Sequence, residues 1–234
     1  MKKYAIITGC AKGIGKQLSL DLASIGYNII GTYNTSLNEI EKLKSDIESK
    51  GGYFDFYKLD LSNEDNINEV CNIIYEKYNN IDLLINNAAL SLDNSFEDKT
   101  KDEFMKVLEV NVVGPFLLIK KLNKLLNGSK IINICSTDGI NTYSKYNMDY
   151  SASKAALINL TKSLSLELKN TKVYALCPNW VNTEAIREMN PDYLKSELER
   201  VGQKKLIEPS EVSNKVHNIL ESELESGIVI VMEG

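Results

Sequence analysis

The chain alternates between short stretches of β-branched and other apolar residues and longer stretches with apolar residues at three- and four-residue spacing. The short stretches predict strands at residues 4–8, 28–33, 53–59, 82–86, 130–136, 171–177 and 227–232. The longer ones predict helices at residues 16–25, 37–50, 63–79, 101–126, 150–169 and 209–220. Strands that alternate with helices are typical of a parallel sheet covered on both faces. The pattern therefore predicts an α/β fold with a doubly wound, seven-stranded parallel sheet.

The chain offers material for one domain. With 234 residues, 43% of them hydrophobic, it can bury one substantial core. It contains no internal repeat, low-complexity tract or Pro/Gly-rich linker, so residues 1–234 are expected to form a single domain. The rhythm breaks at the charged segment 183–206, which contains Pro191 and Gly202 and is too long for a tight connection. Its two interpretations are a substrate lid and a solvated helical insertion.

Composition argues against several classes of function. The formal net charge is −5 and no segment carries a basic stripe, so no nucleic-acid partner is expected. The apolar stretch after the N-terminus is too short for a membrane span or a signal-peptide core, which predicts a soluble, cytoplasmic protein. The four cysteines form no Cys-x-x-Cys pair and there is one histidine, so neither disulfides nor a metal site are expected.

A glycine-rich turn follows the first predicted strand. Gly9, Gly13 and Gly15 lie where the chain turns from strand to helix, and a backbone without side chains lets an anion reach its N–H groups. The helix N-terminus adds a partial positive charge of about half a unit. The spacing differs from the usual dinucleotide fingerprint. The position nevertheless predicts the pyrophosphate loop of a Rossmann-type domain, with a purely structural turn as the alternative.

The end of the second predicted strand indicates which dinucleotide is bound. NAD-binding domains usually place Asp or Glu there, about 20 residues beyond the loop, to bind the ribose 2′-hydroxyl. Here the chain reads Asn34-Thr35-Ser36, and no carboxylate precedes Glu39. Lys12 and the polar groups of Asn34, Thr35 and Ser36 would bind a 2′-phosphate. NADP(H) is therefore expected, and NAD(H) remains the alternative.

A tyrosine and a lysine lie one helical turn apart after the fifth predicted strand. Tyr150 and Lys154 share a helix face, and Ser136 ends the strand. A free tyrosine titrates near pH ~10, so action as a base near neutrality needs roughly 4 kcal/mol of phenolate stabilisation. An ammonium at ~4 Å supplies a similar amount at an effective dielectric of ~20. Both features fall at the sheet edge that carries the glycine loop, which predicts hydride transfer with Tyr150 as acid/base.

These motifs, in this order and spacing, resemble the short-chain dehydrogenase/reductase family in its single-domain form. The resemblance covers almost the whole chain and is carried by the following residues: Thr8, Gly9, Gly13, Ile14, Gly15, Asp60, Leu61, Asn86, Asn87, Ala88, Ala89, Asn111, Ser136, Tyr150, Lys154, Pro178, Asn179, Val181 and Thr183.

The resemblance implies a role for each part of the site. It implies a catalytic set of Asn111, Ser136, Tyr150 and Lys154, with Asn111 holding a water that connects Lys154 to solvent. The residue patterns and the resemblance together predict cofactor contacts from Thr8, Gly9, Lys12, Gly13, Ile14, Gly15, Asn34, Thr35, Ser36, Asp60, Leu61, Asn87, Ala88, Tyr150, Lys154, Pro178, Val181 and Thr183. The resemblance also implies a homo-oligomer, either a tetramer or a dimer, and a small carbonyl or alcohol as substrate.

Within the family the pattern is most similar to 3-oxoacyl-(acyl-carrier-protein) reductases. The similarity lies around Asn86, in the strand before Ser136 and in residues 205–209. Asn179 stands where a glycine is usual, and the turn 169–172 is short and lacks the arginine commonly found there, which weakens the expectation of an acyl carrier protein as partner.

Three functions are compatible with these residues. The leading one is an NADPH-dependent carbonyl reductase or alcohol dehydrogenase, with a 3-oxoacyl thioester or a cyclic or sugar-like ketone as substrate. A non-catalytic NADP-binding regulatory or interaction protein is the alternative, although it would not need Ser136, Tyr150 and Lys154 together. An epimerase or dehydratase of the related longer family normally has a larger C-terminal substrate domain. The physiological substrate stays open, because specificity resides in the loops 90–96, 138–149 and 183–206.

Overall fold

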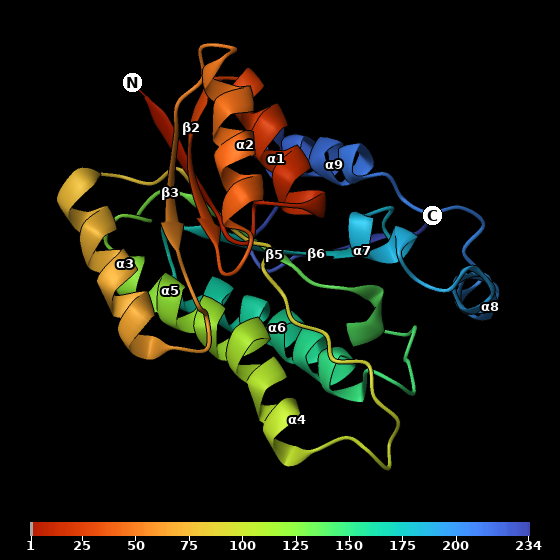
Figure 1. Cartoon of the computed structure of the whole chain (residues 1–234). Coiled ribbons are helices and arrows are strands. Elements are labelled where there is room, and N and C mark those ends of the chain that lie inside the picture. The colour runs from red at the N-terminus through yellow and green to blue at the C-terminus, as the bar shows by residue number, and fades with distance from the viewer. Residues whose placement is uncertain (1) are drawn as a thin grey trace.

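The computed structural model describes residues 2–234 and contains a single seven-stranded sheet (Figure 1). The strands are β1 (Lys3–Ile7), β2 (Tyr27–Tyr33), β3 (Phe54–Lys58), β4 (Leu83–Asn86), β5 (Lys130–Ile134), β6 (Lys172–Pro178) and β7 (Val229–Met232). Every pairing is parallel, and the strand order is β3-β2-β1-β4-β5-β6-β7. The predicted doubly wound parallel sheet is confirmed.

Helices cover both faces of the sheet. In Figure 1, one face carries α1 (Gly13–Ser24), α2 (Leu37–Glu48) and α9 (Pro209–Glu221). The opposite face carries α3 (Glu64–Lys77), α4 (Lys101–Leu108), α5 (Gly114–Leu122) and α6 (Met148–Glu167). Successive side chains of a strand point to opposite faces, so Ala5 and Ile7 of β1 pack in the first layer while Ile6 packs in the second. Both layers are hydrophobic cores made mainly of aliphatic side chains.

The predicted helix at residues 101–126 is three elements. α4 ends at Leu108, a π-helix η1 spans Glu109–Val113, and α5 begins at Gly114. A Cβ on Gly114 would lie 2.5 Å from the carbonyl oxygen of Leu61. This glycine therefore lets α5 pack closely on the segment after β3 that contains Leu61. Widened turns of this kind occur mostly inside α-helices at functional sites. Here the wide turn contains Asn111.

The segment 183–206 folds as two helices, α7 (Glu184–Arg187) and α8 (Pro191–Val201). Asn190 caps α8 by accepting hydrogen bonds from the N–H groups of Asp192 and Tyr193, and Gly202 ends it in the left-handed conformation with φ of 70°. Arg200 joins α8 to the loop before α6, because its guanidinium donates to the carbonyl oxygens of Thr142 and Tyr143. No helix in residues 2–234 has the length and apolar character needed to cross a bilayer.

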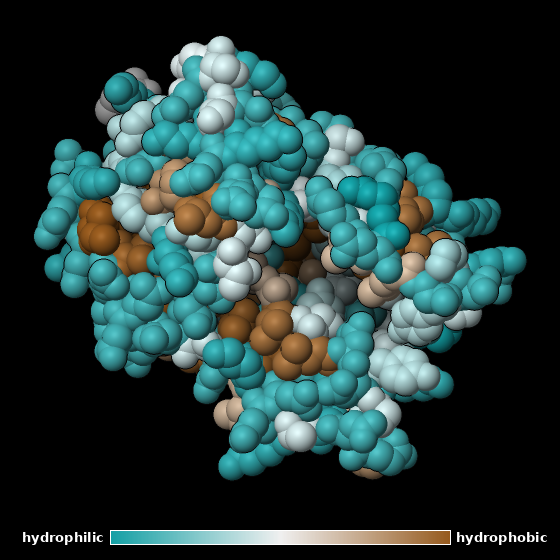
Figure 2. Space-filling view, in the orientation of Figure 1, coloured by the Kyte–Doolittle hydropathy of each residue, from teal (hydrophilic) through white to brown (hydrophobic). Residues whose placement is uncertain are grey.

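The strand order reverses direction between β1 and β4. The chain runs from β1 outward to β3 and then returns to start the other half of the sheet at β4. Ligands of open parallel sheets bind beyond the carboxyl ends of the strands at such a reversal. A cavity of about 820 Å³ lies there, lined by residues from the loops after β1, β2, β4, β5 and β6. Figure 2 shows this face hollowed beside α7, with apolar residues inside and mostly hydrophilic residues around the rim.

Candidate active site

The loop after β1 depends on its three predicted glycines. Gly9 and Gly13 have positive φ angles of 62° and 53°, which side chains rarely tolerate. A Cβ on Gly15 would lie 2.5 Å from the Gly9 carbonyl oxygen and 2.6 Å from the Asn87 amide nitrogen. The loop is thus packed tightly from behind, and its open side faces the cavity. This geometry fits a pyrophosphate.

Thr8 and Asn87 hold the glycine loop against the end of β4. The Thr8 hydroxyl accepts from the backbone N–H groups of Asn87 and Ala88, both at 3.0 Å. The Asn87 side-chain amide donates to the carbonyl oxygens of Thr8 and Gly9 at 2.9 Å and 3.1 Å. Thr8 stands behind the cavity wall, whereas Asn87 and Ala88 line it. Two loops on opposite sides of the strand reversal are therefore fixed to one another.

An internal carboxylate already uses one N–H group of the glycine loop. Glu184, the first residue of α7, accepts a hydrogen bond from the Gly13 N–H at 3.1 Å. The contact places an anionic oxygen at the N-terminus of α1, where positive partial charge favours anions. The loop can therefore bind an anionic oxygen, as a phosphate-binding loop must. No local pattern indicates this contact, because Glu184 is 171 residues away from Gly13 in the sequence.

Lys12 is engaged by a carboxylate that the sequence analysis left outside the site. Its ammonium lies 2.9 Å from Glu39 Oε1, and both side chains are about half exposed. Glu39 belongs to the first turn of α2, which brings it back beside the loop. The hydrogen bond between the two side chains raises the pKa of Lys12 and lowers that of Glu39. Asn34, Thr35 and Ser36 line the same end of the cavity.

Most of the remaining predicted cofactor residues also line the cavity. Asp60 and Leu61 lie at its outer end, where the Asp60 carboxylate accepts from the N–H and hydroxyl of Ser62 at 2.9 Å and 2.6 Å. These hydrogen bonds lower the pKa of Asp60. The cavity is also lined by Gly9, Lys12, Gly13, Ile14, Pro178, Val181 and Thr183. Gly15 and Asn111 stand behind its wall, as Thr8 does.

Ser136, Tyr150 and Lys154 meet at the inner end of the cavity. The Lys154 ammonium lies 5.3 Å from the centroid of the Tyr150 ring and donates to the Ile134 carbonyl oxygen at 2.8 Å. Lys154 is buried, with 2% of its surface exposed. Burial lowers the pKa of its ammonium. The hydrogen bond at the end of β5 orients the ammonium toward the tyrosine.

The surroundings of Tyr150 keep its hydroxyl protonated. Burial raises its pKa most, the negative charge of Asp138 raises it further, and interaction with the Ser136 hydroxyl lowers it. The net change is upward from a value of 10.0. The chain's own groups therefore favour Tyr150 as a proton donor at neutral pH.

Asn111 binds the loop that follows β4. Its side-chain oxygen accepts from the Leu90 N–H at 2.8 Å, and its amide donates to the Leu90 carbonyl oxygen and to Ser153 Oγ, both at 2.9 Å. The π-turn of η1 presents this side chain between two chain segments that lie far apart in the sequence. Asn111 consequently joins the cavity wall to helix α6.

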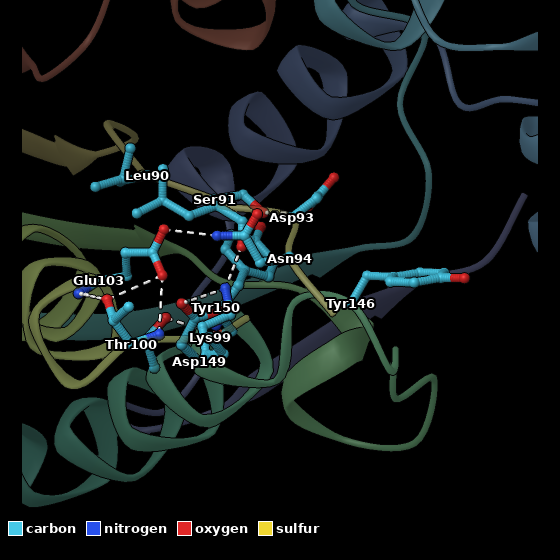
Figure 3. Close-up of polar contacts among 12 residues, drawn as sticks. Leu90, Ser91, Asp93, Asn94, Lys99, Thr100, Glu103, Tyr146, Asp149 and Tyr150 are labelled. Carbon is cyan, nitrogen blue, oxygen red and sulfur yellow. Dashed lines mark hydrogen bonds and ion pairs between the residues drawn. The ribbon is translucent and has the colours of Figure 1, made fainter. Parts of the chain in front are cut away.

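A buried ion pair lies directly before Tyr150 (Figure 3). The Lys99 ammonium is 2.9 Å from Asp149 Oδ2, and the two side chains are 5% and 0% exposed. Lys99 also donates to the Leu92 carbonyl oxygen, and Asp149 accepts from the Tyr150 N–H at 2.9 Å. The pair attaches the segment 90–99 to the first turn of α6. The sequence analysis missed it, because two charges 50 residues apart carry no local signal.

A second set of contacts fixes the same segment. The Asn94 amide donates to Glu103 Oε1 at 2.6 Å, and the Asn94 N–H donates to the Tyr146 carbonyl oxygen at 3.0 Å. Thr100 and Glu103 form a capping box that starts α4. The cavity wall at Leu90, Ser91 and Asp93 is thus tied to both α4 and α6.

The substrate end of the cavity carries Trp180 and Asp138. Trp180 lines the cavity. Tyr146 packs edge-on against Tyr193 of α8, with ring centroids 6.1 Å apart. Tyr143 is 67% exposed, and its hydroxyl donates to the Ile140 carbonyl oxygen. The sequence analysis did not single out Asp138, although it follows Ser136 by two residues.

A parallel Rossmann-type sheet with a glycine loop and a Ser-Tyr-Lys set at one cavity is the arrangement of a nicotinamide-dependent oxidoreductase. The family model described as short chain dehydrogenase matches residues 3–194. The chain belongs to the short-chain dehydrogenase/reductase family, whose enzymes act on CH–OH and C=O groups. The family predicted from the motifs is confirmed.

Curated relatives cover most of the chain. The 3-oxoacyl-(acyl-carrier-protein) reductase of Thermotoga maritima is 31% identical, over 99% of this chain and 96% of its own length. The reductase of the same name from Aquifex aeolicus is 32% identical over 92% of this chain and 88% of its own length. That from Staphylococcus epidermidis is 28% identical over 92% and 90%, respectively.

Solved structures share the whole fold. A dehydrogenase/reductase from Sinorhizobium meliloti superposes with a TM-score of 0.92 at 26% identity, covering 99% of this chain and 94% of that one. A short-chain dehydrogenase from Burkholderia cenocepacia, solved in complex with NADP, gives a TM-score of 0.90 at 24% identity over 99% and 96% of the two chains.

Proposed function

We propose that this chain is an NADP(H)-dependent carbonyl reductase or alcohol dehydrogenase that acts on a ketone or secondary alcohol. The observation that carries the proposal is that Ser136, Tyr150 and Lys154 line the inner end of the cavity whose outer end carries the glycine loop. A dinucleotide that extends through this cavity brings its nicotinamide to the three side chains. A non-catalytic regulator would not need this set at that point.

The chain's residues supply proton transfer and orientation. A bound nicotinamide cofactor supplies the hydride that the carbonyl carbon accepts. Tyr150 donates its proton to the carbonyl oxygen, and Ser136 holds that oxygen beside it. Lys154, fixed by the Ile134 carbonyl oxygen at 2.8 Å, stabilises the tyrosinate that remains. Asn111 supports this set by joining α6 to the Leu90 backbone.

The preference for NADP(H) rests on the end of β2. Asn34, Thr35 and Ser36 carry no negative charge, and Lys12 lies beside them in the cavity lining. Glu39 holds Lys12 by an exposed ion pair, which a 2′-phosphate with its greater charge is expected to displace. The relative from Burkholderia cenocepacia was solved with NADP. NAD(H) is the alternative cofactor.

The relatives also suggest a substrate class. Those named 3-oxoacyl-(acyl-carrier-protein) reductases make a 3-oxoacyl thioester one candidate substrate, and other small or cyclic ketones form the second group. The proposal extends to a homo-oligomer of this chain. An acyl carrier protein as partner belongs only to the thioester branch.

The test follows the loss of NADPH absorbance with purified wild-type protein and Tyr150→Phe. The panel contains simple ketones, hydroxyketones, diketones and 3-oxoacyl thioesters, with NADH in parallel. We expect turnover by wild type and a loss of at least about a hundredfold in Tyr150→Phe, since general acid catalysis contributes about 10²–10⁴-fold. Tyr143→Phe is the matched control, because Tyr143 is 67% exposed outside the cavity lining. Equal activity of wild type and Tyr150→Phe would refute the mechanism.

A further inference from the structure

A carboxylate forms part of the wall that a ketone must touch. Asp138 lies in the short 3₁₀ turn Thr137–Gly139 directly after Ser136, and its backbone N–H donates to Ser136 Oγ at 3.1 Å. Asp138, Ser136 and Tyr150 all line the cavity. The carboxylate is therefore held beside the position where Tyr150 meets a substrate oxygen.

One of the two oxygens of this carboxylate has a hydrogen-bond partner in the protein. The Thr142 hydroxyl lies 2.7 Å from Asp138 Oδ1. No hydrogen bond or ion pair within residues 2–234 reaches Oδ2. Burial raises the pKa of Asp138 most, and the charges of Glu197 and Asp93 act in the same direction. Oδ2 is open to the cavity and can accept a hydrogen bond from a ligand that carries a donor.

The nearby cations do not neutralise this end of the cavity. Arg200 lowers the pKa of Asp138 from a distance, but its guanidinium forms an ion pair with Glu197 at 2.7 Å. Lys99 is held by Asp149, and Lys154 donates to a backbone carbonyl oxygen. A ligand group that approaches Oδ2 thus meets negative charge that the protein has not compensated.

We propose that Asp138 is a specificity-determining residue that selects ketones carrying a hydrogen-bond donor, an ammonium or a hydroxyl group, close to the carbonyl. This inference rests on the proposed reductase function and narrows its substrate class. The donor group binds Asp138 Oδ2 while the carbonyl oxygen binds Ser136 and Tyr150. Such a ketone is held at two of its groups, whereas a simple ketone is held only at its carbonyl oxygen.

The same carboxylate disfavours two other kinds of substrate. A carboxylate or phosphate next to the carbonyl would meet a like charge at short range. An unsubstituted acyl chain would leave Oδ2 without a partner and remove its remaining water. Asp138 therefore argues against 3-oxoacyl thioesters with plain chains as the preferred substrates, although relatives carry that name.

The test measures binding and needs no turnover. Trp180 is the chain's single tryptophan and lines the cavity, so its fluorescence reports ligands directly. The ligands are four alcohols of similar size: 1-amino-2-propanol, 1,2-propanediol, 2-butanol and lactate. Each is titrated into wild type and Asp138→Asn with reduced cofactor present, so that binding of the alcohol is not followed by its oxidation. The four differ only in the group beside the carbinol, which is cationic, hydroxylated, apolar or anionic.

We expect wild type to bind at least one of the two donor ligands about tenfold more tightly than 2-butanol, and lactate most weakly, as for a charge-assisted hydrogen bond. In Asp138→Asn this preference should fall to within about threefold. If the preference over 2-butanol falls only for 1-amino-2-propanol, the selected group is an ammonium. If it falls for 1,2-propanediol as well, a hydroxyl group is also selected. Asp98→Asn is the matched control, since Asp98 is exposed, bonded to the Ser95 hydroxyl and outside the cavity lining.

Several outcomes overturn the proposal. They are equal binding of 2-butanol and the donor ligands by wild type, unchanged selectivity in Asp138→Asn, an equal effect of Asp98→Asn, and no response to any of the four. Repeating the titrations in Tyr150→Phe separates this result from the reductase function. Selective binding without ketone turnover would reject the reductase and keep the role of Asp138, and turnover without selectivity would do the reverse.

Discussion

Tyr150 has a hydroxyl whose pKa lies above its ordinary value, and the sign of that shift predicts how the two reaction directions depend on pH. Burial is the largest cause, followed by the charge of Asp138. The group stays protonated through neutral pH and past about 10. Ketone reduction, which uses the protonated form, should stay level across the neutral range. Alcohol oxidation, which needs the phenolate, should rise with pH.

The variant Asp138→Asn removes one cause of the raised pKa. The profile of alcohol oxidation against pH should therefore move to lower pH, while the profile of the exposed control variant Asp98→Asn should stay at the wild-type position. Initial rates at saturating cofactor across a pH series measure both profiles. A shift of the Asp138→Asn profile to higher pH would contradict the assigned electrostatics of Tyr150.

The ion pair between Lys12 and Glu39 leads to a prediction about cofactor affinity. Glu39→Gln frees the Lys12 ammonium, so NADPH should bind about two- to fivefold more tightly, the range expected for an exposed pair. NADH, which lacks the 2′-phosphate, should change little. Fluorescence titration with both cofactors measures the difference. Glu41→Gln is the matched control on the same helix, because Glu41 is exposed and outside the cavity lining. An equal gain for NADH would mean that Lys12 does not face the 2′-phosphate.

The contrast between these residues explains what sequence alone can predict of the site. Ser136, Tyr150, Lys154 and the glycines were predictable because each belongs to a local motif tied to a strand end. Other residues of the site act through partners that are distant in the sequence, namely Glu39, Glu184 and the pair of Lys99 with Asp149. Asp138 acts through a carboxylate oxygen that has no partner in the described residues. Their roles depend on side-chain geometry, which a linear pattern does not contain.

Among the elements, α6 depends most on contacts outside its own sequence. Its first turn contains Asp149, whose buried carboxylate is paired with Lys99 at 2.9 Å. Lys99→Met leaves that charge without a partner, which typically costs about 3–5 kcal/mol. Urea unfolding monitored by circular dichroism measures the loss. Lys172→Met is the matched control, because its pair with Glu223 is exposed and should contribute at most about 1 kcal/mol.

The double variant Lys99→Met/Asp149→Leu tests the same pair in another way. Replacing both charges with apolar side chains of similar volume is often neutral. We therefore expect it to recover most of the lost free energy of unfolding. If Lys99→Met unfolded at the same urea concentration as Lys172→Met, the pair would have no special role in holding α6.

The sequence predicted elements better than their interruptions. All seven strands were found with ends shifted by at most two residues, since each is a short apolar run between polar turns. The helix predicted at 101–126 was wrong in its middle, where the π-turn of η1 interrupts it. Periodicity does not reveal one extra residue in a turn. Residues 183–206 had two interpretations, a substrate lid and a helical insertion. They fold as two helices, and a role of these helices as a lid stays a prediction.

At the scale of the whole molecule, exposed apolar side chains bear on the expected homo-oligomer. Met105, Val113 and Phe116 are 46%, 46% and 37% exposed along the continuous segment from α4 to α5. Such exposure is often covered by another subunit. Light scattering after size exclusion should give a multiple of the chain mass, and Phe116→Asp should lower it. Ile25→Asp, 51% exposed at the end of α1, is the control that should not. A monomeric wild type would refute the expectation.

The carboxylate of Glu184 links the two ends of the molecule's cavity. It occupies the Gly13 N–H, and it is also the first residue of α7, from which the segment 183–206 continues. A phosphate that takes this N–H must evict Glu184, and the start of the segment moves with it. Dinucleotide and ketone are then not free to arrive in either order. We expect initial-rate kinetics of compulsory order, with the dinucleotide binding first. The contact between Glu184 and the Gly13 N–H would then determine the order of binding, although it lies far from the reacting atoms.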